Sequence, residues 1–274
     1  MKRFPHLFLL FVTLCTLLAA CAGSTTSSNT STPATSPITL NAFAAASLME
    51  SFNEVAAAYQ QLHQDITVKP NYNGSQILEH QIANGAPADV FASADLANMV
   101  KASDAGLVKS SQVFVKNRLV VIIPTSNPGK IQSLKDLARK GVKIDIEADS
   151  VPAGKYSRQA LVNMSKSPDY GSGYKDAVLA NVVSEETNVK AVVQKVQLGE
   201  ADAGFVYRTD VTPTVSSQVT IIVIPDPYNV IAQYPIAVVK SSAHVSDAQA
   251  FVDFVLSPDG QAIMKKHNFI TVNG

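Results

Sequence analysis

The chain from residue 38 onward reads as an alternation of strand-like and helix-like segments. Leu119–Ile123 is a continuous apolar run that ends at Pro124, which is typical of a strand buried on both faces. Ser47–Leu62 carries apolar residues at helical spacing, and Ile66–Tyr72 alternates as a strand does. Such alternation predicts an α/β fold with helices packed on largely parallel sheets.

The same patterns predict the remaining elements. Further strands are expected at 38–43, 90–92, 143–148, 203–207, 219–224 and 236–239. Further helices are expected at 75–84, 96–105, 134–139, 153–165, 189–198, 248–256 and 259–267. In such sheets, ligands lie beyond the carboxyl ends of the strands, at the N-termini of the following helices. The residues directly after each strand are therefore the place to look for a binding site.

The first twenty residues differ from the rest of the chain. Lys2 and Arg3 precede a mostly apolar run at 7–18, and small residues stand before Cys21. This order predicts a secretory signal peptide at 1–20, which is too short for a stable membrane span. The small-small-Cys order resembles the lipobox of bacterial lipoproteins. That resemblance implies cleavage before Cys21 and acylation of its sulfur, and an ordinary signal peptide cut nearby is the alternative.

The cysteines and the following segment support an anchored protein. Cys15 lies in the predicted signal peptide, so Cys21 is the one cysteine left and no internal disulfide is expected. Residues 22–37 contain no large apolar side chain and no charge. We therefore expect 21–37 to be a lipid-anchored, disordered tether. The protein is expected outside the cytoplasm, held to the cell membrane by a lipid on Cys21.

The charge balance excludes some partners. The formal net charge is zero, and removal of Lys2 and Arg3 leaves 20 basic and 22 acidic residues. A chain without a basic excess is a poor candidate for binding nucleic acid. The balance also makes long-range electrostatic capture of an anion unfavourable.

Five predicted strand-to-helix junctions present small neutral residues. They are Ala44–Ser47, Asn73–Ser75, Val151–Gly154, Thr187–Val189 and Val206–Tyr207. Helix N-termini offer free N–H donors and a partial positive charge, which together suit an anion. Ser47, Ser75 and Tyr207 add hydroxyl donors. A dianion without a titrating proton only accepts hydrogen bonds, so a pocket of donors favours it over monohydrogen phosphate. Neutral donors also cost less to desolvate than buried Lys or Arg.

Each of these residues also has a purely structural explanation. Ser47 and Glu50 form the S-x-x-E pattern of a helix capping box. Ser75 could be an N-cap after a turn, Pro152 a first-turn proline, and Tyr207 an ordinary strand aromatic. Periodicity alone therefore leaves the function at an α/β ligand-binding domain.

Several sequence strings resemble one family along essentially all of 38–274. FAAASL (43–48), GAPADVFASAD (85–95), VPAG (151–154), GFVYRTD (204–210) and YPIAVV (234–239) look like the molybdate-binding protein family of ABC importers. GAPAD followed by F-x-SAD is the most specific of them. The resemblance implies that the anion is bound by the hydroxyls of Ser47, Ser75 and Tyr207 and by the backbone amides of Ala153 and Val189.

The chain departs from the family pattern at two places. Asn73-Gly74 precedes Ser75, where some relatives carry a serine run, and Arg208 follows the tyrosine, where glycine is common. Neither departure removes a donor.

The resemblance also implies an architecture and a mechanism. It implies the type II periplasmic-binding-protein fold, with mixed, mostly parallel sheets and a hinge. Lobe I is expected at 38–118 and 235–274, and lobe II at 119–234. Molybdate or tungstate, which have nearly the same size and charge, would bind between the lobes. Hinge closure would then present a form that a membrane permease recognises. No enzymatic activity and no cofactor are expected, and the protein is expected to be a monomer.

Other functions remain open at this stage. A phosphate-ester hydrolase using Ser47 or Ser75 would need a base or a metal beside the serine, and no such motif is visible. A sulfate, phosphate or organic-acid binder, or a tethered interaction domain without a small ligand, would also fit the composition. Lys155, Arg118 and Arg208 are the charged alternatives for contacting an anion.

Overall fold

The computed structural model describes residues 37–272. The predicted signal peptide, Cys21 and the predicted tether up to residue 36 lie outside the described residues. Among the helices of residues 37–272, none combines the length and the apolar character needed to cross a membrane.

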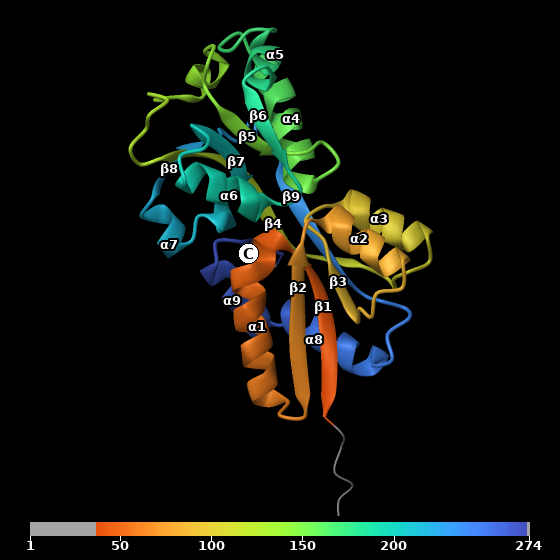
Figure 1. The fold of residues 1–274 in the computed structure, drawn as a ribbon. Coiled ribbons are helices and arrows are strands. Elements are labelled where there is room, and N and C mark those ends of the chain that lie inside the picture. The colour runs from red at the N-terminus through yellow and green to blue at the C-terminus, as the bar shows by residue number, and fades with distance from the viewer. Residues whose placement is uncertain (1–36, 273–274) are drawn as a thin grey trace, which may run out of the picture. The chain divides into compact units, whose positions relative to one another are not determined.

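The described part of the chain alternates between strands and helices, as the sequence predicts (Figure 1). The strands are β1 (Ile38–Ala45), β2 (Ile66–Asn73), β3 (Val90–Ala92), β4 (Gln112–Pro124), β5 (Ile144–Glu147), β6 (Val182–Glu186), β7 (Ala203–Tyr207), β8 (Val219–Val223), β9 (Ile231–Val238) and β10 (Ile270–Thr271). The α-helices are α1 (Met49–Leu62), α2 (Ser75–Ala83), α3 (Leu96–Asp104), α4 (Pro152–Ser165), α5 (Tyr174–Leu179), α6 (Val189–Gln197), α7 (Pro213–Ser216), α8 (Val245–Leu256) and α9 (Pro258–Lys266). Short 3-10 helices are η1 (Ala46–Leu48), η2 (Leu134–Ala138) and η3 (Arg208–Asp210).

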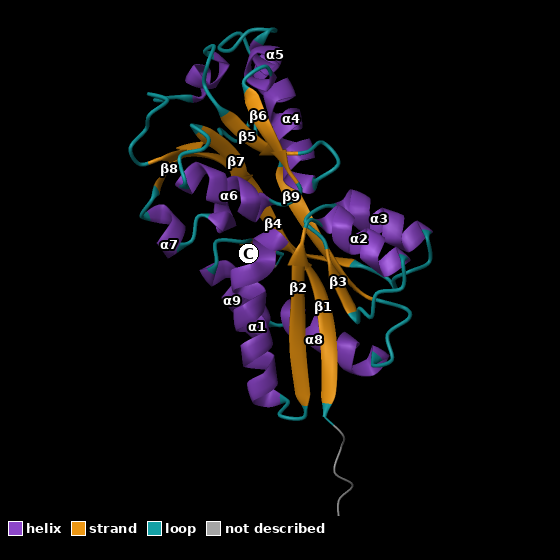
Figure 2. Ribbon diagram, viewed as in Figure 1, coloured by secondary structure: helices purple, strands orange, loops and turns teal. Residues whose placement is uncertain are grey.

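The strands follow one hydrogen-bonded order, β2-β1-β3-β9-β4-β7-β5-β6, with β8 and β10 also paired to β4 (Figure 2). Strand β4 lies in the middle of this order and takes part in both halves of it. Its residues Gln112–Arg118 pair with β9, and its residues Leu119–Ile122 pair with β7. We call β1, β2, β3, β9, β10 and the first part of β4 the first sheet. The rest of β4 with β5, β6, β7 and β8 is the second sheet.

The pairing is mixed, which confirms the predicted mixed α/β class. β1 runs parallel to β2 and β3, and β5 runs parallel to β6 and β7. β4 and β9 pair antiparallel with their neighbours. The registers bring strand ends together, because Ala45 is opposite Asn73 and Glu147 is opposite Glu186. The residues that follow parallel strands are thereby gathered at one edge of each sheet.

Helices cover both faces of the first sheet. The alternation of β1 sends Leu40 and Ala42 toward the core that includes α1 and α8, and sends Phe43 toward the core under α2 and α3. Phe52 and Phe251 meet edge to face in the first of these cores, with ring centroids 6.3 Å apart. Burying each such side chain contributes about 1.5–3 kcal/mol to stability. We call the first sheet with η1, α1, α2, α3, α8 and α9 the first-sheet side.

The second sheet is covered by α4, α5, α6 and α7, and together they form the second-sheet side. Helix α6 buries valines at helical spacing: Val189, Val192, Val193 and Val196. Gly204 of β7 lets this helix approach, because a Cβ there would lie 2.7 Å from Val192 and 2.8 Å from Val196. The predicted apolar run 119–123 is fully buried in β4, as a central strand requires.

Candidate functional site

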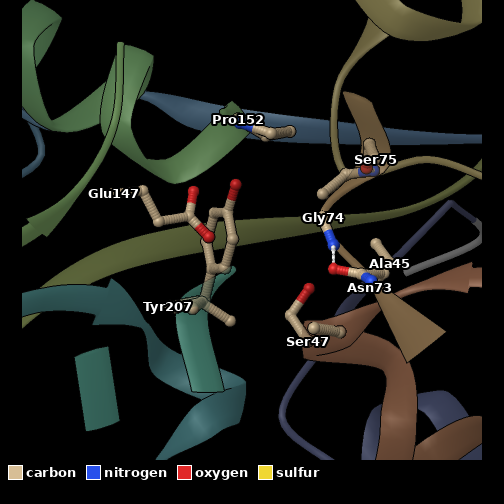
Figure 3. Close-up of a pocket in the computed structure, with 11 residues that line it drawn as sticks. Ala45, Ser47, Asn73, Gly74, Ser75, Glu147, Pro152 and Tyr207 are labelled. Carbon is tan, nitrogen blue, oxygen red and sulfur yellow. Dashed lines mark hydrogen bonds between the residues drawn. The ribbon is translucent and has the colours of Figure 1, made fainter. Parts of the chain in front are cut away.

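A small pocket lies where strand ends of the first-sheet side meet those of the second-sheet side (Figure 3). Its volume is about 10 Å³, which is room for about one water molecule. The lining residues are Ala45, Ala46, Ser47, Asn73, Gly74, Ser75, Ala94, Glu147, Pro152, Val189 and Tyr207. Four of the five predicted site residues line the pocket, and the fifth, Ala153, follows its lining residue Pro152.

Ser47 lies in η1, directly after β1, and is buried. Its Oγ is 2.8 Å from the Tyr234 hydroxyl oxygen. The capping-box explanation of Ser47 is wrong, because α1 begins at Met49 and Leu48 caps it without a side-chain hydrogen bond. The S-x-x-E pattern failed because the strand-end turn places Ser47 ahead of the α-helix, where Tyr234 engages its hydroxyl.

A hydrogen-bond chain orients the Ser47 hydroxyl. Asn117 Oδ1 accepts from the Arg118 amide at 2.9 Å, so its Nδ2 must donate, and it does so to the Tyr234 hydroxyl at 3.3 Å. With one lone pair of Tyr234 used, the Tyr234 O–H can donate to Ser47 Oγ. The Ser47 hydrogen is then left to donate into the pocket. Sequence reasoning missed Asn117 and Tyr234 as site residues, although Tyr234 begins the YPIAVV string.

Ser75 is the first residue of α2 and is also buried. Its Oγ accepts a hydrogen bond from the Ala94 amide at 2.9 Å, which leaves its own hydrogen to donate. Gly74 before it allows a close approach between the two sides of the fold. A Cβ at Gly74 would lie 2.2 Å from the Thr187 carbonyl oxygen, so no other residue fits this arrangement.

Tyr207 ends β7, and its side chain is 1% exposed. Its hydroxyl is buried and has no hydrogen-bond partner among residues 37–272. Burial raises the pKa of Tyr207 well above its usual value, so the hydroxyl stays protonated and can donate. A buried hydroxyl without a partner costs about 1–3 kcal/mol. The Tyr207 hydroxyl is therefore a hydrogen-bond donor without an acceptor among the described residues.

The two backbone donors stand at the starts of helices. Val189 is the first residue of α6, so its N–H has no acceptor within the helix, and the Asn188 side chain instead accepts from Ala191. Ala153 is the second residue of α4. Its N–H donates to Glu147 Oε2 at 2.7 Å, and the Gly154 N–H donates to the same oxygen at 3.1 Å.

The pocket also contains an ionisable side chain, Glu147, although the sequence predicted neutral donors alone. It is the last residue of β5, is 3% exposed, and its carboxyl group lies beside Tyr207 on the wall opposite the two serines (Figure 3). Burial raises the pKa of the Glu147 carboxyl to about 8, although its two amide partners act to lower it. Sequence reasoning missed Glu147 because only neutral residues were sought at the strand ends. Its position at the end of a predicted strand was the available signal.

The charged alternatives from the sequence do not line this pocket. Arg118 pairs with Asp226 at the surface, and Lys155 lines a separate cavity with Asp149. Arg208 follows Tyr207 in η3 and is also absent from the lining.

Two polar contacts join the two sides beside the pocket. Lys190 of α6 pairs with Glu50 of α1 at 2.8 Å and lies 3.4 Å from Asp210. Gln76 Nε2 of α2 donates to the Thr187 carbonyl at 2.9 Å. Burial raises the pKa of Asp210 to about 6, while Lys190 acts to lower it. These contacts hold the strand ends of both sides close together.

The fold is α/β, and its pocket brings polar groups of two sheets together. The chain belongs to the family of bacterial extracellular solute-binding proteins, whose family model matches residues 40–270. The predicted periplasmic-binding-protein fold is confirmed, since a solved substrate-binding domain and solved molybdate- and sulfate-binding proteins share it.

Three similar proteins have names that indicate molybdate binding or an ABC transporter. The molybdate-binding protein ModA of Mycobacterium tuberculosis is 33% identical over 92% of this chain and 92% of its own length. YvgL of Bacillus subtilis, whose name describes a candidate ABC transporter substrate-binding lipoprotein, is 32% identical over 96% of each chain. A solved substrate-binding domain of a candidate molybdenum ABC transporter from Clostridium difficile is 32% identical. It covers 86% of this chain and 99% of its own, with a TM-score of 0.63.

Proposed function

We propose that this protein is the substrate-binding component of an ABC importer for molybdate. It captures the tetrahedral oxyanion with neutral hydrogen-bond donors and delivers it to the membrane permease. The observation that carries the proposal is the Tyr207 hydroxyl, which is buried at the pocket without a partner among the described residues. The names of the relatives in M. tuberculosis and C. difficile support molybdate as the ligand.

The donor set suits a fully deprotonated oxyanion. Ser75 Oγ accepts from the Ala94 amide, and Ser47 Oγ can accept from the Tyr234 hydroxyl, so each serine can donate its own hydrogen to the ligand. Tyr207 and the Val189 amide add donors from the second-sheet side. An ion with four acceptor oxygens and no proton satisfies all of them without needing an acceptor from the protein. Tungstate, sulfate or another oxyanion of the same geometry is the alternative ligand.

Binding is proposed to couple to closure of two lobes, residues 38–118 with 235–274 and residues 119–234. The ion pair between Glu50 and Lys190 and the hydrogen bond between Gln76 and Thr187 both cross between these segments. An anion bridging donors of both lobes would stabilise the closed arrangement that such contacts require.

The anchor is a further part of the proposal. Signal cleavage would leave Cys21 as the N-terminal residue, and its acylation would hold the binding protein at the outer face of the membrane. The lipoprotein name of the B. subtilis relative supports this placement. Labelling with a radioactive fatty acid tests it: Cys21→Ser should lose the label and leave the membrane fraction.

A thermal-shift and calorimetry panel tests the ligand assignment. Because a ligand that binds only the folded protein raises the melting temperature by mass action, the thermal shift detects binding before any affinity is measured. We expect strong shifts with molybdate and tungstate, a weak shift with sulfate and almost none with phosphate. A protein that responds to phosphate or sulfate but not to molybdate would contradict the proposal.

A further inference from the structure

The carboxyl group of Glu147 occupies the place that an anion would take at the start of α4. Its Oε2 accepts the N–H groups of Ala153 and Gly154 at 2.7 and 3.1 Å. These are first-turn amides, and the N-cap residue Val151 provides no side-chain acceptor of its own. The carboxyl therefore caps α4 from the end of β5, and uses an amide that the anion site would need.

With the two lobes as close together as they are here, the pocket has too little room for an oxyanion unless one of its lining side chains moves. A volume of about 10 Å³ holds about one water molecule, and a tetrahedral ion with four oxygens is larger than that. Withdrawal of the Glu147 carboxyl would enlarge the pocket beside the Tyr207 hydroxyl and release two amide donors at once.

The other walls of the pocket have less freedom. Ser47 is held by Tyr234, and the hydroxyl of Ser75 is held by the Ala94 amide. Gly74 has no side chain, and the ring of Pro152 is fixed at the first turn of α4. Glu147 is the lining residue with a long unbranched side chain and an acceptor group that a ligand oxygen can replace.

Electrostatics favours the same movement. An ionised Glu147 next to a dianion would be a pair of like charges in a buried place, so a bound dianion disfavours the charged form of this carboxyl at the amides. The carboxyls of Asp210 and Asp95 add negative charge near Glu147, and the pocket is lined by no Lys or Arg side chain among the described residues. Ligand and carboxyl therefore compete for the same amides.

We propose that the Glu147 carboxyl is an internal stand-in for the anion. It occupies the amides of Ala153 and Gly154 in the ligand-free protein and withdraws from them when the anion binds. Glu147 thereby sets the affinity of the site without being one of its donors. This inference rests on the proposed function.

The test is calorimetric titration of Glu147→Ala with sodium molybdate. Loss of the competing acceptor should lower Kd about tenfold, which corresponds to the usual worth of a helix cap. Asp136→Ala is the matched control, because Asp136 Oδ2 also accepts two amide hydrogens, from Gln132 and Ser133, but lies away from the pocket. The control should leave Kd unchanged.

Melting temperatures give a second reading of the same competition. Without ligand, both variants should melt at a lower temperature than the wild type, because each has lost a capping carboxyl. With saturating molybdate, only Glu147→Ala should melt at the same temperature as the wild type with saturating molybdate, because the anion then caps α4. A Kd that rises or stays the same in Glu147→Ala would overturn the inference.

If Glu147→Ala does not fold, a crystal structure of the wild type with molybdate still tests the inference. In crystals of the wild-type protein with molybdate, Glu147 Oε2 should lie beyond hydrogen-bond distance of the Ala153 amide, with an anion oxygen in its place. A complex in which Glu147 keeps both amides would overturn the inference.

Failure of the proposed function is distinguishable from failure of this inference. If the wild type binds molybdate but Glu147→Ala binds it no more tightly, only the inference fails. If neither protein binds molybdate, tungstate or sulfate, both fail. If Glu147→Ala binds molybdate and the wild type does not, the proposed function fails, because the native protein must bind the ion to deliver it.

Discussion

The two sides of the fold differ in how their buried carboxyl groups are hydrogen-bonded. On the first-sheet side, Asp89 accepts with both carboxyl oxygens, from Asn41 and Ser242, and Asp95 accepts with Oδ1 from Ser93 and Asn98. On the second-sheet side, Asp145 is fully buried and neither of its carboxyl oxygens has a partner within residues 37–272.

The raised pKa values of the carboxyl groups follow the same division. Burial raises the pKa of Asp145 to about 7, of Glu147 to about 8 and of Asp210 to about 6, and all three belong to the second-sheet side. Tyr207, whose hydroxyl has no partner among the described residues, is on this side as well. The buried carboxyls of the first-sheet side are therefore hydrogen-bonded within the protein, whereas the second-sheet side holds a carboxyl, Asp145, and a hydroxyl, Tyr207, without partners among the described residues.

The largest effect is expected where Gly74 of the first-sheet side lies close to Thr187 of the second-sheet side. Gly74→Ala would place a Cβ 2.2 Å from the Thr187 carbonyl oxygen, so the two sides could no longer close over the pocket. We expect a loss of about 3 kcal/mol in binding, roughly a hundredfold rise in Kd for molybdate by calorimetry.

Gly173→Ala is the matched control for that change. A Cβ at Gly173 meets nothing within 4 Å, and its φ of −83° suits an L-residue. Its Kd should equal that of the wild type. Equal affinities for Gly74→Ala and Gly173→Ala would show that the approach of Gly74 to Thr187 does not matter for binding.

A smaller effect is expected from removing a donor on the first-sheet side. Ser47→Ala should weaken molybdate binding by about 2 kcal/mol, roughly thirtyfold in Kd, because one ligand oxygen loses its partner. Ser51→Ala removes a buried hydroxyl of α1 that bonds only the Leu48 carbonyl among the described residues. Calorimetry on both variants should show weaker binding for the first alone, and normal binding by Ser47→Ala would remove Ser47 from the site.

The buried carboxyl of Asp145 predicts a pH dependence of stability. Its pKa of about 7 is above the usual 3.8, chiefly because of burial and then because of Glu186. The folded state therefore binds this proton more tightly than the unfolded state, so the Asp145 contribution lowers the free energy of unfolding as pH rises from about 4 to about 7.

Asp145→Asn should remove this contribution. The variant should be more stable than the wild type by about 2 kcal/mol at pH 8 and nearly equal to it below pH 4, as measured by urea unfolding. Asp136→Asn should behave in the opposite way, because amides of Gln132 and Ser133 lower the pKa of Asp136. A gain for Asp145→Asn that is the same at both pH values would refute the assignment to the carboxyl charge.

The smallest effect is expected at the ion pair between the two sides. Glu50→Gln removes the partner of Lys190, and since both side chains are partly exposed the loss should be about 0.5 kcal/mol, roughly twofold in Kd. Glu54→Gln breaks a pair with Lys266 that stays within the first-sheet side. If both variants weaken binding equally in low salt, the Glu50 pair has no special part in closure.

The sequence predicted the alternation of elements and the location of the pocket because both follow from local rules. Ser47 and Ser75 meet because the parallel strands β1 and β2 end at one edge of the first sheet, and Tyr207 stands at the end of β7 in the second sheet. Helix α5 and strand β6 were missed: Gly171 and Gly173 interrupt the pattern, and β6 buries none of its residues fully.

Long-range partners could not be read from the sequence. Asn117 and Tyr234 are 117 residues apart, and their hydrogen bond depends on the pairing of β4 with β9. The contact between Ser47 and Tyr234 spans 187 residues and overrides the local capping pattern. Glu147 was missed for a different reason, since a carboxyl capping amides was not expected where an anion should bind.

Crystals of the protein grown with molybdate test the central claim most directly, because molybdenum scatters anomalously and marks its own position. The account predicts one molybdenum peak in the pocket, with oxygens accepting from Ser47 and Ser75 on one side and from Tyr207 and Val189 on the other. A peak held by Lys or Arg side chains, or by one side alone, would contradict it.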